Sequence, residues 1–120
     1  SFIMNIQELA TLRRYGIALK IVVLDNSSLG LVRQWQELFF DKNFSEIDLS
    51  DNPDFVAVAQ AFGIDAFRIS QREDVSAGIA RLLDATGPCL AHVVIDPNEN
   101  VWPLVPPGKS NSDMMHGEAP

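Results

Sequence analysis

The fold is decided by residues 18–40, which read ALKIVVLDNSSLGLVRQWQELFF. Residues 18–24 are almost continuously apolar and β-branched apart from Lys20, which is typical of a parallel strand covered by helices on both faces. Residues 25–28 supply turn and helix-capping residues, and apolar side chains then recur at helical spacing. The stretch therefore predicts a buried central strand that passes directly into a helix over residues 29–40.

A helix is also expected before this strand, over residues 6–15. Asn5 and Glu8 have the spacing of a capping box, in which each side chain satisfies a backbone N–H of the first turn. Basic residues lie in the last turn, where positive charge suits the helix dipole. Gly16 is placed to end the helix.

Two further helices and two strands are expected after the polar connection of residues 41–51. Asn52-Pro53-Asp54 predicts the start of one helix, with Asn52 as its cap, and Gly63 is placed to end it. Residues 66–69 and 89–95 predict strands. Between them, residues 70–73 have capping-box spacing before a helix that Gly87-Pro88 ends. The expected core-facing residues of the two helices are Phe55, Val58, Ala59 and Phe62, then Val75, Ile79, Leu82 and Leu83.

The order of these elements predicts an α/β fold with a parallel sheet flanked by helices on both faces, a partial, flavodoxin-like three-layer sandwich. Residues 1–97 would form this domain. We expect it to be incomplete at its N-terminal side, because helical patterning begins almost at Ser1. Residues 98–120, proline-rich and then polar, are expected to form a C-terminal tail over the surface whose last residues are mobile.

Composition limits the possible partners of the chain. The 120 residues carry a formal net charge of −7 with scattered basic residues, which argues against nucleic acid as a partner. No apolar run reaches the roughly 18 residues of a membrane-spanning helix. The one cysteine, Cys89, lies in an apolar run and is expected to be a buried thiol. We therefore expect a cytoplasmic protein without membrane contact.

The turn after the first strand is the best candidate for chemistry. Ligands of open α/β sheets collect beyond the carboxyl ends of the strands, and residues 24–30 (LDNSSLG) form such an end. The N-terminus of the following helix would offer free N–H groups to a phosphate. This pattern alone does not separate a binding site from an ordinary turn.

Three segments together resemble acetolactate synthase (acetohydroxyacid synthase), in the C-terminal, thiamine-diphosphate-binding region of its large catalytic subunit. They are residues 1–9 (SFIMNIQEL), residues 24–36 (LDNSSLGLVRQWQ) and residues 101–108 (VWPLVPPG). The resemblance covers nearly the whole chain. It is closest to bacterial forms with Asp-Asn, as at Asp25-Asn26, where many relatives have Asn-Asn. It implies the thiamine-diphosphate-binding fold.

The resemblance also implies a magnesium site. In this family a motif opens with Gly-Asp-Gly or a variant and closes with an asparagine pair, and Ser1 and Phe2 correspond to residues just after the opening. The metal-binding aspartate would therefore precede this sequence, whereas Asn26 matches the metal-binding asparagine and Ser28 the residue that lends its backbone carbonyl. Mg²⁺ prefers six oxygen ligands, several of them from phosphate and water. We expect the chain alone to bind Mg²⁺ and thiamine diphosphate weakly.

By the same resemblance, Gly30, Leu31 and Val32 would contact the cofactor, with Leu31 helping to hold it bent. Trp35 would shape the pocket for the second keto acid. The alternative for Trp35 is a core aromatic residue, because Leu31, Leu38 and Phe39 share its side of the helix. No catalytic residue is assigned, because the family's activating glutamate belongs to a partner subunit.

The remaining polar residues receive simpler interpretations. Arg33 and Gln34 are expected to be solvated helix residues. His92 is expected to be a hydrogen-bonded core residue and His116 part of the tail, since neither has a partner at metal-ligand spacing. Glu37, Asp41 and Glu46 are expected to be exposed or loop-bound, which gives a paired-carboxylate site little support.

The implied function is a thiamine-diphosphate-dependent transferase of branched-chain amino-acid biosynthesis. It would condense two pyruvates to 2-acetolactate, or pyruvate with 2-oxobutyrate, and the chain alone would be inactive. The complete enzyme would be a dimer or tetramer of catalytic subunits with FAD in another domain and a small regulatory subunit. Two alternatives remain open: a free-standing, non-catalytic flavodoxin-like binding module, or a related thiamine-diphosphate-dependent pyruvate decarboxylase or oxidase. Trp35 and the Pro-Pro-Gly segment argue against the latter.

Overall fold

The computed structural model describes residues 2–117, which fall into two compact units. The first unit consists of the residues up to Asp25 together with Asp51–Ile95. The second consists of Asn26–Ser50 together with the residues from Asp96 onward. Ser1 and residues 118–120, which include the predicted mobile end of the tail, lie outside the described residues.

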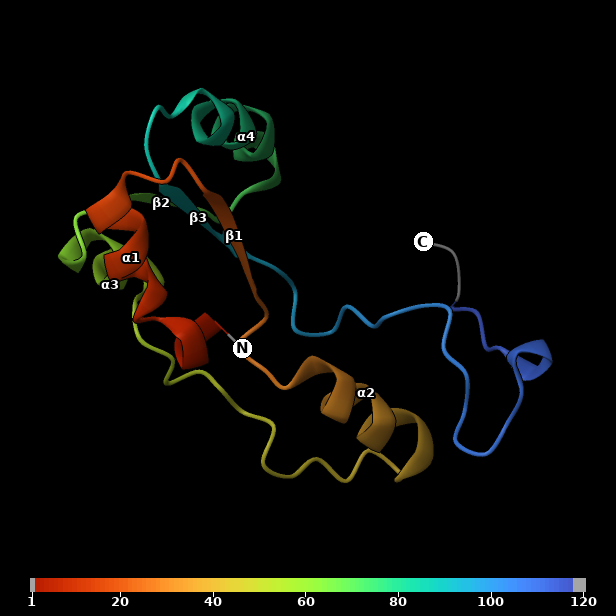
Figure 1. Cartoon of the computed structure of the whole chain (residues 1–120). Coiled ribbons are helices and arrows are strands. Elements are labelled where there is room, and N and C mark those ends of the chain that lie inside the picture. The colour runs from red at the N-terminus through yellow and green to blue at the C-terminus, as the bar shows by residue number, and fades with distance from the viewer. Residues whose placement is uncertain (1, 118–120) are drawn as a thin grey trace. The chain divides into compact units, whose positions relative to one another are not determined.

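The first unit is a parallel sheet between helices (Figure 1). Its three strands are ordered β1-β3-β2, and β3 pairs in parallel with both neighbours. The predicted parallel α/β architecture is therefore confirmed. The prediction of a buried central strand at residues 18–24 is wrong, because β1 is an edge strand on which Val22 and Leu24 are 53% and 64% exposed. In chain order, the elements of this unit are the 3₁₀ turn η1 (Phe2–Asn5), α1 (Glu8–Tyr15), β1 (Lys20–Asp25), α3 (Phe55–Ala61), β2 (Asp65–Ile69), the 3₁₀ turn η2 (Arg72–Asp74), α4 (Val75–Asp84) and β3 (Cys89–Val94).

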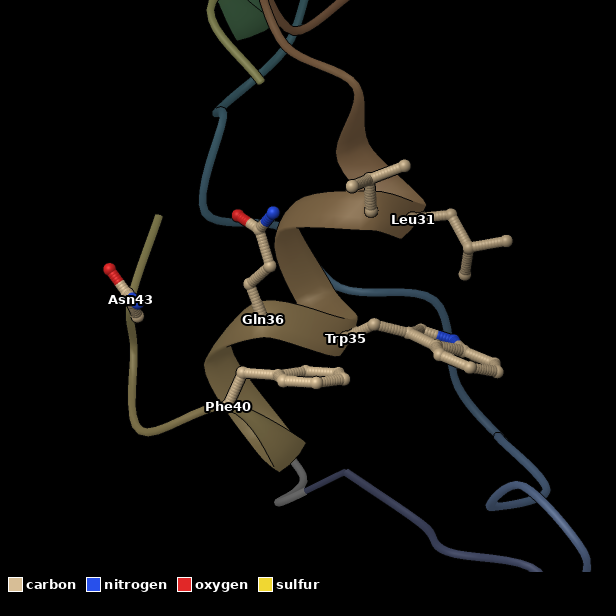
Figure 2. Close-up of a pocket in the computed structure, with 6 residues that line it drawn as sticks. Leu31, Trp35, Gln36, Phe40 and Asn43 are labelled. Atoms are coloured by element: carbon tan, nitrogen blue, oxygen red, sulfur yellow. The ribbon is translucent and has the colours of Figure 1, made fainter. Parts of the chain in front are cut away.

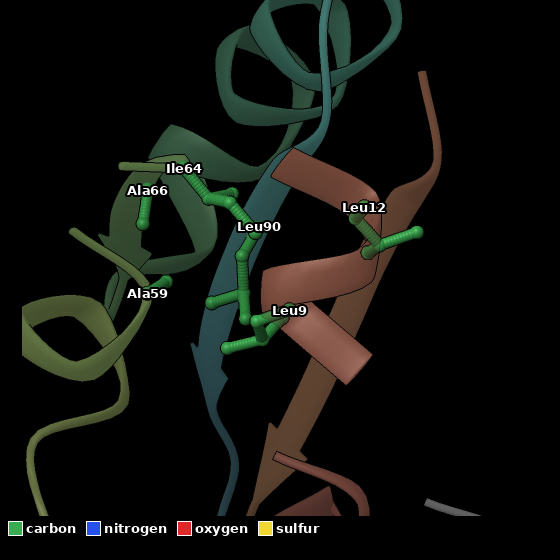
Figure 3. Packing of buried hydrophobic residues seen from close by; sticks show 6 residues of the cluster. All are labelled: Leu9, Leu12, Ala59, Ile64, Ala66 and Leu90. Atoms are coloured by element: carbon green, nitrogen blue, oxygen red, sulfur yellow. The ribbon is translucent and has the colours of Figure 1, made fainter. Parts of the chain in front are cut away.

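Helices α1 and α3 cover one face of the sheet and bury the larger core cluster. The buried members are Leu9, Leu12, Ala59, Ile64, Ala66 and Leu90. Figure 3 shows the Leu90 side chain between those of Leu9 and Ile64. Leu90 is completely buried, and burial of such a side chain contributes about 1.5–3 kcal/mol. Phe55 and Ala59 are buried on α3, as its periodicity predicts.

Helix α4 covers the other face only in part. Its Leu82 packs with Ile69, Cys89 and Ala91 in a second cluster, which confirms the buried thiol. The prediction that Val75, Ile79 and Leu83 also face the core is wrong, because they are 37%, 49% and 66% exposed. Val75 and Ile79 line a groove between α4 and the sheet, together with Val22 and Leu24 of β1.

Lys20 interrupts the apolar run of β1 for a reason that the sequence pattern does not reveal. Its ammonium group donates hydrogen bonds to the backbone oxygens of Ala85 and Gly87, just beyond the end of α4. The last carbonyls of a helix have no partner within the helix, and a cation suits that end of its dipole. Lys20 therefore anchors the end of α4 to the edge strand.

The helix ends differ from the predicted caps. The N-cap of α1 is Gln7 without a side-chain hydrogen bond, so the Asn5–Glu8 capping box is wrong, whereas Gly16 ends the helix at φ 62° as predicted. Helix α3 is capped by Asp54 rather than by Asn52, and Asp54 accepts the N–H groups of Val56 and Ala57. The capping box predicted at residues 70–73 is also wrong, because a 3₁₀ turn intervenes before α4.

The second unit contains α2 (Gly30–Phe39) and the C-terminal segment. Helix α2 confirms the prediction for residues 29–40 almost to the residue, although its N-cap, Leu29, makes no side-chain cap. The C-terminal segment is folded: Leu104 and Met115 form an antiparallel bridge, and η3 (Asn111–Asp113) carries a capping box. Within residues 2–117, no helix combines the length and the apolar character that crossing a membrane requires.

Candidate functional site

The predicted metal-binding residues Asn26 and Ser28 form a tight corner directly after β1 in the chain. The side-chain oxygen of Asn26 accepts the backbone N–H of Ser28 at 3.2 Å. Between them, Ser27 has a φ of 52°, in the left-handed region that non-glycine residues rarely occupy. Such backbone strain persists where the surrounding structure requires it, often at ligand sites. The corner therefore holds the Asn26 side chain against the following peptide.

The pairing of Ser28 shows where its carbonyl points. Ser28 and Asp48 form an isolated antiparallel bridge whose hydrogen bonds run from Leu29 N–H to Ile47 O and from Leu49 N–H to Ser27 O. In this pattern the bridged residues are the non-hydrogen-bonded pair, so their own N–H and C=O groups point away from the partner segment. The Ser28 N–H is directed at Asn26, and the Ser28 carbonyl lies on the same side. Two neutral oxygens are thus presented together.

Gly30 leaves the room that this arrangement requires. A Cβ atom at position 30 would lie 2.6 Å from the side-chain nitrogen of Asn26, closer than such contacts occur. Only glycine therefore allows the Asn26 carboxamide to lie over the first turn of α2. The predicted cofactor residue Gly30 and the predicted metal residue Asn26 are in direct contact.

A buried polar atom at the corner is unsatisfied. The hydroxyl oxygen of Ser28 is inaccessible and has no hydrogen-bond partner within residues 2–117. Buried polar groups almost always have a partner, and an exception calls for an explanation. A bound polar group is one such explanation, and it agrees with a site for an ion or a diphosphate.

The donor set at the corner suits part of a magnesium site. Mg²⁺ is bound by oxygen and commonly takes only a few ligands from protein. The Asn26 carboxamide and the Ser28 carbonyl are ligands of this kind. Among the described residues, no three His, Cys, Asp or Glu side chains are grouped so that they could hold a metal.

Opposite Ser28 in the bridge, the carboxylate of Asp48 is stabilised in its charged form by Ser50. The backbone N–H and the hydroxyl of Ser50 both donate to the Asp48 carboxylate, at 2.9 and 3.1 Å. These hydrogen bonds, the backbone one foremost, lower the pKa of Asp48 below its ordinary value. The residue opposite Ser28 is therefore an anion at neutral pH.

A pocket of about 400 Å³ lies along α2. It is within the size range of small-molecule sites, and its lining is mainly apolar with two carboxamides. Figure 2 shows the side chains of Leu31 and Trp35 projecting from the same side of the helix. The lining residues are Leu31, Val32, Trp35, Gln36, Phe40 and Asn43.

Trp35 is half-buried and stacks edge-on against Phe39, with ring centroids 5.9 Å apart. Its indole N–H is buried without a partner within residues 2–117. A buried tryptophan N–H usually finds an acceptor. Trp35 therefore has features of both predicted roles, because it packs on a helix neighbour like a core aromatic residue and also lines a pocket. Its role toward a keto acid stays a prediction.

The predicted solvation of Arg33 and Gln34 is wrong. Gln34 is 1% exposed, and its carboxamide pairs with the backbone of Val101. The Arg33 side chain is 15% exposed and bonds to Glu37 and Asn98. The sequence gives no local signal for the contacts with Asn98 and Val101, because these partners lie more than 60 residues away.

His92 confirms its prediction as a hydrogen-bonded core residue. It is 2% exposed, and its Nε2 lies 2.9 Å from the carboxylate of Asp25 in the first unit. The ring also contacts Phe55 edge-on. Sequence reasoning identified neither partner. His116, by contrast, is exposed in the C-terminal segment, as predicted.

Comparison with known protein families decides the family. Residues 1–93 match the family described as "Thiamine pyrophosphate enzyme, C-terminal TPP binding domain". The chain belongs to this family. The corner of Asn26, Ser28 and Gly30 falls within the matched region, as do α2, β1, β2 and all of β3 except Val94.

Curated relatives carry the similarity across almost the whole chain. The acetolactate synthase isozyme 2 large subunit of Escherichia coli (strain K12) is 56% identical over 115 residues, which are 96% of this chain and 21% of that protein. The acetolactate synthase large subunit of Parasynechococcus marenigrum (strain WH8102) is 45% identical over 96% of this chain and 19% of its own length. The chain therefore spans about a fifth of these relatives.

A solved structure supports the fold. The thiamine diphosphate-dependent 4-hydroxybenzoylformate decarboxylase of Rhodococcus jostii RHA1 superposes with a TM-score of 0.70 at 23% sequence identity. The match covers 79% of this chain and 18% of that one. At this identity the likeness shows a shared fold, and it confirms the thiamine-diphosphate-binding α/β architecture.

Proposed function

We propose that this chain forms the cofactor-binding part of an acetolactate synthase large subunit. The whole subunit would condense two pyruvates to 2-acetolactate, or pyruvate with 2-oxobutyrate, in branched-chain amino-acid biosynthesis. Similarity to acetolactate synthases over nearly the full chain supports this activity. The structural observation that carries the proposal is the corner, where Asn26 and Ser28 present two oxygens on one side of the backbone.

The corner would hold Mg²⁺ through the carboxamide oxygen of Asn26 and the backbone carbonyl of Ser28. Diphosphate and water oxygens would supply further ligands, together with a carboxylate elsewhere in the large subunit. When bound, thiamine diphosphate supplies the carbanion chemistry by which bonds beside a keto group break and form. The contribution of this chain is to bind and orient that group.

Residues of the first turn of α2 would pack against the cofactor. Gly30 brings the backbone close, and Leu31 and Val32 offer apolar surface that is 55% and 46% exposed. Trp35, one turn after Leu31, would shape the pocket for the second keto acid. Its indole N–H, which has no partner among residues 2–117, adds a donor that a substrate oxygen could use.

The surroundings of this chain in the complete protein follow from the same proposal. We expect the rest of a large subunit and a second large subunit in a dimer or tetramer. We also expect FAD bound outside this chain, a small regulatory subunit and a cytoplasmic location. The chain alone would bind Mg²⁺ and thiamine diphosphate weakly and would not turn over pyruvate.

The test is product analysis of the complete large subunit supplied with pyruvate, Mg²⁺ and thiamine diphosphate. The proposal expects 2-acetolactate, and 2-aceto-2-hydroxybutyrate when 2-oxobutyrate is added. Trp35→Leu should keep the first product and lose much of the preference for 2-oxobutyrate. Release of acetaldehyde or acetate without condensation would instead indicate a decarboxylase or oxidase. Micromolar cofactor affinity of residues 1–120 alone, measured by calorimetry, would contradict the expected weak binding.

A further inference from the structure

Among the described residues of the second unit, Gln34 is the most deeply buried polar residue, at 1% exposure. Both ends of its carboxamide bond to one residue. Its Nε2 donates to the carbonyl of Val101 at 2.9 Å, and the N–H of Val101 donates to its Oε1 at 3.0 Å. A buried carboxamide is costly without partners. Because both bonds go to the same residue, the pair fixes the register of the C-terminal segment along α2.

More exposed contacts surround this pair. Arg33 donates to Asn98 at 2.7 Å, and Asn100 donates to Glu37 at 3.2 Å. The Arg33 and Glu37 side chains are 15% and 26% exposed, so solvent screens these contacts more than the Gln34 pair. The buried carboxamide is therefore the contact that decides how α2 and residues 98–101 are joined.

The segment joined at Val101 is itself folded. The backbone groups of Leu104 and Met115 exchange hydrogen bonds at 2.9 and 2.7 Å. Gly117 lies against the indole of Trp102 so closely that a Cβ atom at position 117 would overlap the ring. Residues 101–117 are therefore held together by contacts of their own, and the pair at Val101 is where this segment is tied to α2.

We propose that Gln34 is a positioning residue of the pocket along α2: its pairing with Val101 fixes the rotation of the helix against the C-terminal segment, and thereby the direction of Trp35. Successive helical residues are turned by about 100°, so a rotation that breaks the pair also redirects the neighbouring indole. The inference rests on the proposed function for what the pocket binds. The joining of the two segments does not depend on it.

Helix α2 provides a matched control. Gln36 makes the same kind of reciprocal pair with Ser45, from Nε2 to the carbonyl and from the N–H to Oε1, both at 3.0 Å. This pair ties α2 to the connection of residues 41–50 instead of the C-terminal segment. Gln34→Met and Gln36→Met thus each remove a reciprocal pair of bonds on the same helix with the same substitution, one buried at Gln34 and one exposed at Gln36.

The first experiment measures amide hydrogen exchange in the whole chain. Gln34→Met should speed exchange of the Val101 N–H roughly fivefold, the factor that the net contribution of about 1 kcal/mol from one hydrogen bond implies. In a Trp35→Phe background, emission from Trp102 should also shift to the red. Gln36→Met should leave both unchanged. The amides of Leu29 and Leu49 report that the second unit remains folded. Unchanged Val101 exchange in folded Gln34→Met would overturn the inference.

The second experiment separates positioning from general stability in the complete large subunit. Gln34→Met should raise the KM for 2-oxobutyrate several-fold more than it lowers kcat, with thiamine diphosphate affinity unchanged. Faster Val101 exchange with an unaltered KM would overturn the positioning role. If the wild-type subunit forms no 2-acetolactate, the proposed function fails, whereas the exchange result still decides whether Gln34 joins the two segments.

Discussion

His92 and Asp25 join the central strand to the edge strand through a bond of 2.9 Å between Nε2 and the carboxylate. Beside it, the N–H of Ile95 donates to the backbone oxygen of Asp25 at 2.9 Å. The side chains of His92 and Asp25 are 3% and 15% exposed, so solvent replaces little of this bond when it is lost. The end of β1 that leads into Asn26 is thus held by side-chain and backbone contacts.

Removing this bond should weaken the first unit. We expect His92→Leu to lower the free energy of unfolding by about 1–3 kcal/mol, because the Asp25 carboxylate stays largely shielded after losing this partner. Asp25→Asn keeps a polar group of the same shape and should cost less. Urea denaturation followed by circular dichroism measures both. Equal stability of His92→Leu and the wild type would show that the bond contributes nothing.

A methyl group at position 30 should disturb the corner without disturbing the fold. Gly30→Ala places a Cβ atom 2.6 Å from the Asn26 side chain, which must then move. We expect Mg²⁺-dependent affinity for thiamine diphosphate in the complete large subunit to fall roughly 10–100-fold, as when a contact that orients a metal ligand is lost. Gly87→Ala is the control, since a Cβ there meets nothing within 4 Å. Equal effects of the two substitutions would refute the steric account.

Gly78 of α4 packs against Ile69 of β2, and this contact predicts that Gly78→Ala lowers stability, although helix propensity alone predicts a gain. Alanine is better than glycine inside a helix by about 1 kcal/mol. A Cβ at Gly78 would overlap the end of the Ile69 side chain and lie 2.9 Å from its Cγ1, and such overpacking costs about 1–3 kcal/mol. We expect Gly78→Ala to lower the thermal midpoint, whereas the exposed Ser76→Ala on the same helix should raise it. A midpoint raised by both would mean that Ile69 yields freely.

The cap of α3 should make stability depend on pH in acid. The N–H of Ala57, followed by that of Val56, lowers the pKa of the Asp54 carboxyl. A lowered folded-state pKa stabilises the protein fully above the unfolded value near 4, and this contribution is lost as the pH falls through the folded value. Asp54→Asn keeps the acceptor but not the charge. The urea midpoint should therefore fall less between pH 7 and pH 3 in Asp54→Asn than in the wild type. An identical fall in the two proteins would contradict a stabilising role of the Asp54 charge.

Periodicity predicts the elements of this fold well because it is a local property. The apolar runs of residues 18–24 and 89–95 correspond to β1 and β3, and helical spacing after Gly30 corresponds to α2. Capping predictions were less successful, since Asn5–Glu8 spacing does not make a cap when the backbone takes a 3₁₀ turn first. The sequence also does not reveal which apolar helix residues are buried by a neighbouring element. Ile79, for example, has helical core spacing but is 49% exposed.

In the candidate site, too, residues close in sequence are predictable from a motif, whereas contacts between distant residues are not. Asn26, Ser28 and Gly30 are close in sequence and could be assigned from the motif, and the structure brings them into contact. The helical pattern predicts a solvated Gln34, because a polar residue in such a pattern usually faces water. Its partner, Val101, lies 67 residues away, and no spacing rule connects them.

The most direct test of the account is calorimetric titration of thiamine diphosphate, at saturating Mg²⁺, into the complete large subunit carrying Asn26→Leu. Asn111→Leu, an exposed asparagine outside the corner, is the control. We expect Asn26→Leu to lose at least as much affinity as Gly30→Ala, while Asn111→Leu binds like the wild type. Wild-type affinity in Asn26→Leu would contradict the claim that this corner holds the metal and its diphosphate.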